Sequence, residues 1–110
     1  MEFPQSRHDF IAALIARCNG FEWDAGNIDK NWFGHGVTDA ESEEPFGNLP
    51  LMLRDDPKHS QIEDRYIALG KTDVNKLLTV VFTIRGDKIR SISARPMSVM
   101  DRRDYATQGA

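Results

Sequence analysis

Five arginines follow the most hydrophobic stretch of the chain, and their side chains suit an anionic ligand. A planar guanidinium offers paired N–H donors that match the oxygens of a phosphate or a carboxylate. All five lie between residues 85 and 103, and they are Arg85, Arg90, Arg95, Arg102 and Arg103. We interpret this segment as a cationic surface that binds an anion.

Three side chains elsewhere are candidates for moving protons beside such a ligand: His35, His59 and Glu63. Histidine changes charge near neutral pH, and glycines on both sides of His35 expose its ring. His59 precedes a serine in a polar loop, and its alternative role is to stabilise that loop by local hydrogen bonds. Glu63 and Arg65 flank a strand entrance, where they could also form an ordinary surface ion pair worth ~0–1 kcal/mol.

A β-hairpin is predicted to carry the arginines. Residues 77–84 are rich in β-branched and aromatic side chains, residues 85–88 form a turn around Gly86, and residues 89–95 return as the second strand. Strict alternation along the second strand separates its side chains into two sets. One face would carry Ser91, Ser93 and Arg95, and the other would carry Arg90, Ile92 and Ala94.

Helix signals precede and follow this hairpin. Ser6 is a predicted N-cap for a first helix, and Thr38 with Glu41 forms a capping box for a short helix that ends near Pro45. Asp24 is a predicted cap for a helix over residues 25–33, in which Ile28 and Trp32 would pack inward.

Two further strands are predicted over residues 49–53 and 66–70, and Ser98 is the predicted cap of a last helix. Helices followed by antiparallel strands and a final helix are typical of an α+β domain. We therefore predict a small antiparallel sheet of about four strands, flanked by N-terminal helices and a C-terminal helix. We expect these helices to pack on one face of the sheet.

Composition and charge limit the possible functions. The 110 residues suit one domain, and the single cysteine excludes an intramolecular disulfide and a cysteine-based zinc site. The apolar run over residues 10–16 is too short to span a membrane, so we expect a cytoplasmic protein. Six cations and two carboxylates give residues 85–103 a charge of +4, which leaves −7 on the remainder of a chain with net charge −3. The alternative is that these charges mix in space and cancel.

Seven short stretches resemble, in order, the BrnT family of toxins from type II toxin–antitoxin modules. They are FEWD at 21–24, KNW at 30–32, HGV at 35–37, DPKHS at 56–60, RYIALG at 65–70, VFTIRG at 81–86 and ISAR at 92–95. The resemblance implies a single domain over residues 1–110, with residues 1–20 as an N-terminal helical extension and residues 21–105 as the core. It also implies a RelE-like fold.

The resemblance further implies RNA cleavage that inhibits translation and a partner that neutralises it. That partner would be a BrnA-like ribbon-helix-helix antitoxin, joined to the toxin in a hetero-oligomer, which we expect to be a heterotetramer. The complex would bind operator DNA only through the antitoxin. No cofactor, no metal and no membrane is expected.

Cleaving RNA without a metal needs a base for the 2′-hydroxyl, cations for the pentavalent phosphate and a proton for the 5′-oxygen. From this chemistry and the resemblance we expect a catalytic set and an RNA-binding set. The catalytic set is His35, Glu63, Arg65, Arg85 and Arg95, and the RNA-binding set is Lys30, Arg90, Arg102 and Arg103.

Two features favour an alternative, which is a weak or inactive toxin that serves as an antitoxin-binding co-repressor. Val99-Met100-Asp101 stands where relatives carry Arg-Lys-Glu, and the sequence pI is near 5.5. Both features weaken an electrostatic hold on RNA. A metal-dependent hydrolase is a third hypothesis, because Asp55, Asp56 and His59 are close in sequence, but no second ligand cluster accompanies them.

Overall fold

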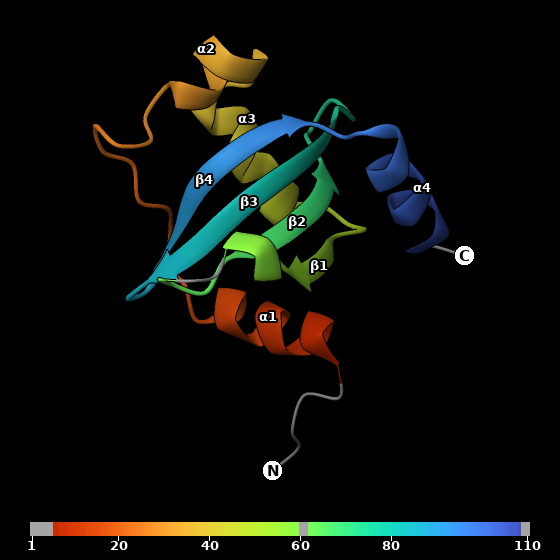
Figure 1. Ribbon diagram of the computed structural model, residues 1–110, viewed down its shortest axis with the longest axis horizontal. Coiled ribbons are helices and arrows are strands. Elements are labelled where there is room, and N and C mark those ends of the chain that lie inside the picture. The colour runs from red at the N-terminus through yellow and green to blue at the C-terminus, as the bar shows by residue number, and fades with distance from the viewer. Residues whose placement is uncertain (1–5, 60–61, 109–110) are drawn as a thin grey trace.

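The computed structural model describes residues 6–59 and 62–108, without the side chains of His59 and Gln108. It contains one four-stranded antiparallel sheet in which each strand pairs with the next along the chain (Figure 1). The strands are β1 (Met52–Asp55), β2 (Tyr66–Lys71), β3 (Leu77–Arg85) and β4 (Lys88–Pro96). The predicted α+β class and the predicted hairpin are confirmed. The first strand begins at Met52, three residues later than predicted.

Four α-helices surround this sheet, and local capping explains where three of them begin. The α-helices are α1 (Arg7–Ala16), α2 (Lys30–His35), α3 (Asp39–Glu43) and α4 (Val99–Gln108), and the 3₁₀ helices are η1 (Glu44–Gly47) and η2 (Pro57–His59). Ser6 Oγ accepts from the Asp9 amide at 3.1 Å, and Thr38 and Glu41 form the predicted capping box. Ser98 Oγ accepts from the Asp101 amide at 3.1 Å. These predicted caps are confirmed.

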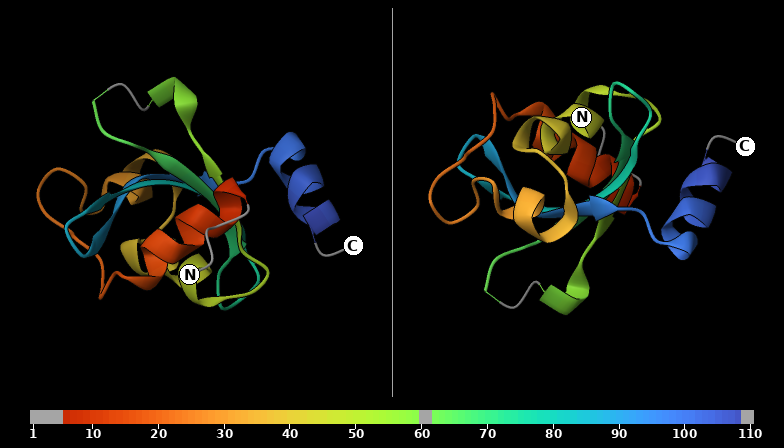
Figure 2. Two further views of the ribbon diagram at one scale, coloured as in Figure 1. Left: turned by 90° about the horizontal axis from the view of Figure 1, so that it is seen from below. Right: turned by 90° about the horizontal axis from the view of Figure 1, so that it is seen from above.

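The main core lies on one face of the sheet, beneath α1, α3 and η1 (Figures 1 and 2). Ile11 of α1 and Leu53 of β1 are buried in it. Phe82 of β3 is 0% exposed, with the rings of Phe46 and Tyr66 at centroid distances of 5.1 Å and 5.5 Å. These rings join the helical layer to the central strands.

The last helix packs on the opposite face, so the expectation that all helices cover one face is wrong. Tyr105 of α4 forms a second core with Met97 and Leu69, and its hydroxyl donates to the Pro50 carbonyl at 2.6 Å. Leu69 and Leu77 point to this face because Leu69 pairs with Thr79 in the register. The apolar end of that face therefore requires its own cover.

The second helix begins at Lys30, five residues later than predicted. Residues 25–29 form turns instead, in which Asp24 Oδ1 accepts from the Gly26 amide at 2.8 Å. Asn31 is the buried residue of α2, and its Oδ1 accepts from the Ala94 amide at 2.9 Å. Ile28 and Trp32 consequently face solvent, and Trp32 is 54% exposed. The prediction that they pack inward is wrong, because a polar side chain docks this helix on the sheet.

A β-bulge in β4 overturns the predicted alternation of that strand. Ser91 pairs with Phe82 and Ser93 pairs with Val81, which leaves Ile92 as an extra residue without a partner. The extra residue shifts the alternation by one. Relative to the residues before Ile92, the residues after it therefore lie on the opposite face from the one that a regular strand would give them. Arg90, which pairs with Thr83, shares a face with Ser93 and Arg95, while Ser91 and Ala94 turn to the main core.

The outer edge of β4 is covered by the segment over residues 20–31. The Ile89 amide donates to the Gly20 carbonyl and the Glu22 amide donates to the Ile89 carbonyl, both at 2.9 Å. Asn27 Nδ2 donates to the Ser91 carbonyl at 3.2 Å, and Asn31 accepts from Ala94 as described above. This coverage fixes the start of α2 against the sheet.

Candidate functional site

The face of β3 and β4 opposite the main core carries a row of polar and cationic side chains. We call it the arginine face and define it by the residues Thr79, Thr83, Arg85, Arg90, Ser93 and Arg95. Helix α4 covers only the Leu77 end of this face, whereas Arg85 at the turn end is exposed. Thr79 and Thr83 are each 2% exposed, because Thr79 lies beneath α4 and Thr83 donates to the Asp64 carbonyl. A ligand would therefore meet the arginines and Ser93.

Three arginines and three carboxylates alternate at the turn end of the arginine face. We call them the arginine–carboxylate network: Arg65, Glu63, Arg85, Glu22, Arg90 and Asp24. In that order, the successive nitrogen–oxygen distances are 3.7, 3.3, 3.7, 2.8 and 2.9 Å. Opposite charges thus meet in space here, as the alternative interpretation of the charge pattern supposed.

Arg90 is the least exposed arginine of the network, at 8%. Its Nη1 donates to Glu22 and Asp24, and its Nη2 donates to Asp24 Oδ1 at 3.0 Å. These bonds, chiefly the one to Asp24, raise the pKa of the Arg90 guanidinium above its usual value. A Cβ on Gly26 would lie 2.8 Å from Arg90 Nη2, so the glycine permits this close approach.

Sequence reasoning missed Glu22 and Asp24. Glu22 reaches the network because Phe21 forms a parallel bridge with Ile89, which is 68 residues further along the chain. Spacing in the sequence carries no signal of that contact. The FEWD stretch contained both carboxylates and was the one available indication.

The hydrogen bond to Arg90 makes the contribution of Asp24 to stability depend on pH. It lowers the pKa of Asp24 below its ordinary value near 3.8, and the Gly26 amide lowers the pKa further. A carboxylate whose pKa is lowered in the folded state stabilises the fold at pH values above its unfolded-state pKa. That stabilisation is lost as the pH falls through the folded-state pKa. We expect Asp24→Asn to unfold more easily than wild type at pH 7 and equally easily near pH 2. Urea titrations across this range test it, and a difference that persists unchanged at low pH would contradict it.

Arg95 lies at the α4 end of the arginine face. It pairs with Thr79 in the register, six residues along β3 from Arg85, which corresponds to roughly 20 Å. Its Nη1 lies 3.7 Å from Asp101 Oδ2, which also accepts from Thr79 Oγ1 at 2.8 Å. Arg95 therefore pairs with an acid of the last helix, which is an ordinary structural role beside the expected catalytic one.

His35 lies apart from the network. It lines a pocket of about 430 Å³ with Arg102, Lys76, Leu77 and other residues at the opposite end of the hairpin. Leu77 and Arg85 are eight residues apart on β3, or roughly 26 Å. Of the expected site residues, the structure thus brings together Glu63, Arg65, Arg85 and Arg90, and it leaves Arg95 and His35 apart from them.

The other expected residues lie at the periphery. Lys30 Nζ donates to the Ile92 carbonyl at 3.3 Å on the outer edge of β4, and Arg103 is exposed on α4. The side chain of His59 lies outside the described part of the structure. Within residues 6–59 and 62–108, no three histidine, cysteine or acidic side chains are grouped so as to hold a metal ion. None of the described helices has the length and apolar character to cross a membrane.

The family model for BrnT, the ribonuclease toxin of type II toxin–antitoxin systems, matches residues 23–101, which is more than half of the chain. The chain belongs to the BrnT family. A search of the curated proteins finds no relative that matches it. The BrnT match includes the whole sheet and begins one residue after Glu22, while α1 lies outside it and still contributes Ile11 to the core.

Proposed function

We propose that this BrnT-family protein is an endoribonuclease that cleaves RNA without a metal ion, at the arginine–carboxylate network. The observation that supports the proposal is the alternation of Arg65, Arg85 and Arg90 with Glu63, Glu22 and Asp24 at the turn end of the arginine face, where Arg85 is exposed. Guanidinium groups bind and stabilise a phosphate, and a neighbouring carboxylate supplies a base. Membership of a ribonuclease toxin family makes RNA the substrate class.

The proposed reaction uses the ribose 2′-hydroxyl as nucleophile. Glu63 takes its proton, the new 2′-oxygen–phosphorus bond forms, and the bond from phosphorus to the 5′-oxygen breaks. Arg85 and Arg90 stabilise the additional negative charge of the pentavalent phosphate. The leaving 5′-oxygen takes a proton from solvent, so the products are a 2′,3′-cyclic phosphate and a 5′-hydroxyl.

RNA is proposed to continue from the network along the arginine face toward α4. Ser93 presents a small, partly exposed side chain between the cations, and Arg95 and Arg102 would contact phosphates further along the RNA. Arg103 and Lys30 would contribute to the surrounding positive field. The RNA phosphates would replace carboxylates as partners of the arginines, and the affinity should fall with salt.

A cleavage assay with purified protein, free of any antitoxin, tests this proposal. We expect single-stranded RNA to be cut in the presence of excess EDTA, leaving cyclic phosphate ends. A substrate with a 2′-deoxyribose at the cut position should resist cleavage there, because it lacks the nucleophile. Cleavage that needs an added metal ion, or that proceeds at the deoxyribose, would contradict the mechanism.

His35 is proposed to bind RNA in the pocket with Arg102 rather than to take part in the bond-breaking step. We expect His35→Ala to raise KM severalfold and to leave kcat within about threefold, because Leu77, which lines the same pocket, lies roughly 26 Å along β3 from Arg85. Steady-state cleavage of a short RNA measures both constants. If kcat falls about 10²-fold or more, His35 acts in the chemistry itself, as general acids and bases do.

We also propose a BrnA-like ribbon-helix-helix antitoxin as the partner, in a heterotetramer that reaches operator DNA through the antitoxin. Membership of a type II toxin family implies an antitoxin, and a short neighbouring gene for a ribbon-helix-helix protein would identify it. A substrate of cellular RNA and a chain with one cysteine fit a cytoplasmic location.

A second function, an inactive co-repressor that only binds the antitoxin, is favoured by one observation. Each arginine of the network already has a carboxylate within 3.7 Å, so RNA must compete with internal partners. The same cleavage assay separates the two functions. Tight antitoxin binding by a protein that does not cut RNA or halt translation would establish the co-repressor.

A further inference from the structure

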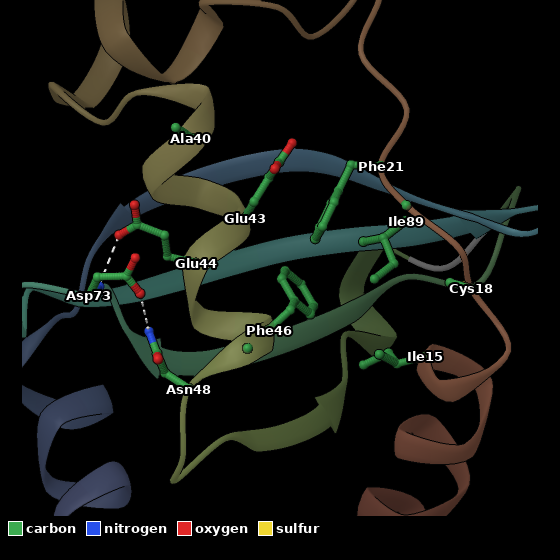
Figure 3. Close-up of a pocket in the computed structure, with 12 residues that line it drawn as sticks. Ile15, Cys18, Phe21, Ala40, Glu43, Glu44, Phe46, Asn48, Asp73 and Ile89 are labelled. Carbon is green, nitrogen blue, oxygen red and sulfur yellow. Dashed lines mark hydrogen bonds between the residues drawn. The ribbon is translucent and has the colours of Figure 1, made fainter.

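A broad groove lies on the main-core side of the sheet, opposite the arginine face. Its volume is about 590 Å³, and it runs between the end of α1 and the α3–η1 segment. Figure 3 shows Ile15 and Cys18 on one side, with Phe21, Phe46 and Ile89 between them and the acidic residues of the other side. Ile89 is buried at the floor of the groove, whereas Ile15, Cys18, Phe21 and Phe46 are only partly buried, so part of each side chain is exposed.

The other side of this groove is acidic. Glu43, Glu44 and Asp73 line it, and the hydrogen bonds that their side chains accept from described residues come from neutral groups. Glu43 accepts from Trp23 Nε1 at 2.6 Å, Glu44 from the Asp73 amide at 2.9 Å, and Asp73 from Asn48 Nδ2 at 3.0 Å (Figure 3).

No ion pair is recorded for these three carboxylates among the described residues. The arginine–carboxylate network shows the opposite arrangement, because each of its carboxylates contacts an arginine. An apolar groove beside uncompensated negative charge is complementary to a segment that carries both apolar and cationic side chains.

We propose that this groove is the docking site for a basic amphipathic segment of the antitoxin. The proposal rests on the proposed function, which supplies an antitoxin as partner. Apolar side chains of that segment would cover Phe21 and Phe46, and its lysines or arginines would face Glu43 and Glu44. A second copy of this chain fits less well, because the arginines of its network are already paired with carboxylates.

The position of the groove implies that the part of the antitoxin that docks there is not the part that blocks the arginine–carboxylate network. Because it lies on the face opposite the arginine face, a segment held there leaves the network to a different part of the antitoxin. The groove would therefore determine the affinity of the complex, while another segment determines whether RNA is excluded.

Cys18 provides a direct reporter, because it lines the groove and is the only cysteine in the chain. The probe is a maleimide dye, applied to the intact protein alone and in complex with the antitoxin of its own module. We expect the antitoxin to slow labelling at least tenfold. Equal labelling rates with and without antitoxin would overturn the proposal, and slower labelling at higher protein concentration without antitoxin would assign the groove to self-association instead.

Substitutions on the rim test charge and shape. Ala40 is exposed in α3, and a side chain at Gly47 would meet no atom within 4 Å, so Ala40→Arg and Gly47→Lys should fold normally. We expect each to weaken antitoxin binding at least tenfold by titration, because both add positive charge and bulk. Glu43→Gln, which can still accept from Trp23, should weaken binding and reduce its salt dependence.

The matched control is Ala13→Arg, the same change at an exposed position of α1 outside the groove. It should bind the antitoxin like wild type. Unchanged affinity of Ala40→Arg and Gly47→Lys would overturn the proposal. These binding readouts require no RNA cleavage, so failure of the nuclease proposal would appear separately, as an inactive protein whose Cys18 is still protected.

Discussion

Arg85→Ala is expected to reduce RNA cleavage by about 10²- to 10³-fold, the loss typical of removing one donor to a transition-state anion. Arg85 is the member of the network that contacts both Glu63 and Glu22, at 3.3 Å and 3.7 Å. Its removal takes away the cation closest to the proposed base and leaves two carboxylates that repel the phosphate. The measurement is the single-turnover rate on a short RNA, which reports the chemical step.

Two variants make this result specific. Arg85→Lys keeps the charge but loses the paired donors, so we expect it to recover only part of the lost rate. Arg7→Ala removes an arginine of α1 whose Nε lies 2.7 Å from Asp55 Oδ2, away from the arginine face. This variant should cleave RNA like wild type. A full rate in Arg85→Ala would show that the network is not the reaction centre.

Phe82→Ala is expected to lower the free energy of unfolding by about 3–5 kcal/mol, a large part of the roughly 5–15 kcal/mol available to a domain of this size. Phe82 is fully buried in β3, an inner strand of the sheet, and its ring packs against the rings of Phe46 and Tyr66. The cavity would loosen η1 from the sheet. Urea denaturation followed by circular dichroism measures the change.

The same substitution at Phe33 is the matched control. Phe33 is 86% exposed on α2, so Phe33→Ala should change the free energy of unfolding by less than about 0.5 kcal/mol. If the two variants unfold at the same urea concentration, the ring cluster does not hold η1 to the sheet.

Local signals in the sequence were sufficient for the starts of three helices and for the hairpin. The caps at Ser6, Thr38 and Ser98 involve groups three residues apart, so their geometry follows from the chain itself. The hairpin was likewise predicted correctly, because alternation and a turn glycine are short-range patterns.

The site depended on contacts that no short-range pattern contains. The bulge at Ile92 brings Arg90 to the same face as Arg95, and it can be recognised only from the pairing of β3 with β4. Glu22 and Asp24 meet Arg90 across 68 and 66 residues. The buried residue of α2, Asn31, was not predicted. Hydrophobic periodicity cannot identify the buried side of a helix that contacts the sheet through an asparagine side chain.

The covering of β4 by residues 20–31 also has a consequence for how the protein behaves when it is abundant. An uncovered strand margin is a template on which other molecules can assemble and eventually form fibrils. Here the outward groups of Ile89, Ser91 and Ala94 are already engaged by the same chain. Molecules produced in excess of their antitoxin should therefore not aggregate from this side, and the free toxin can persist.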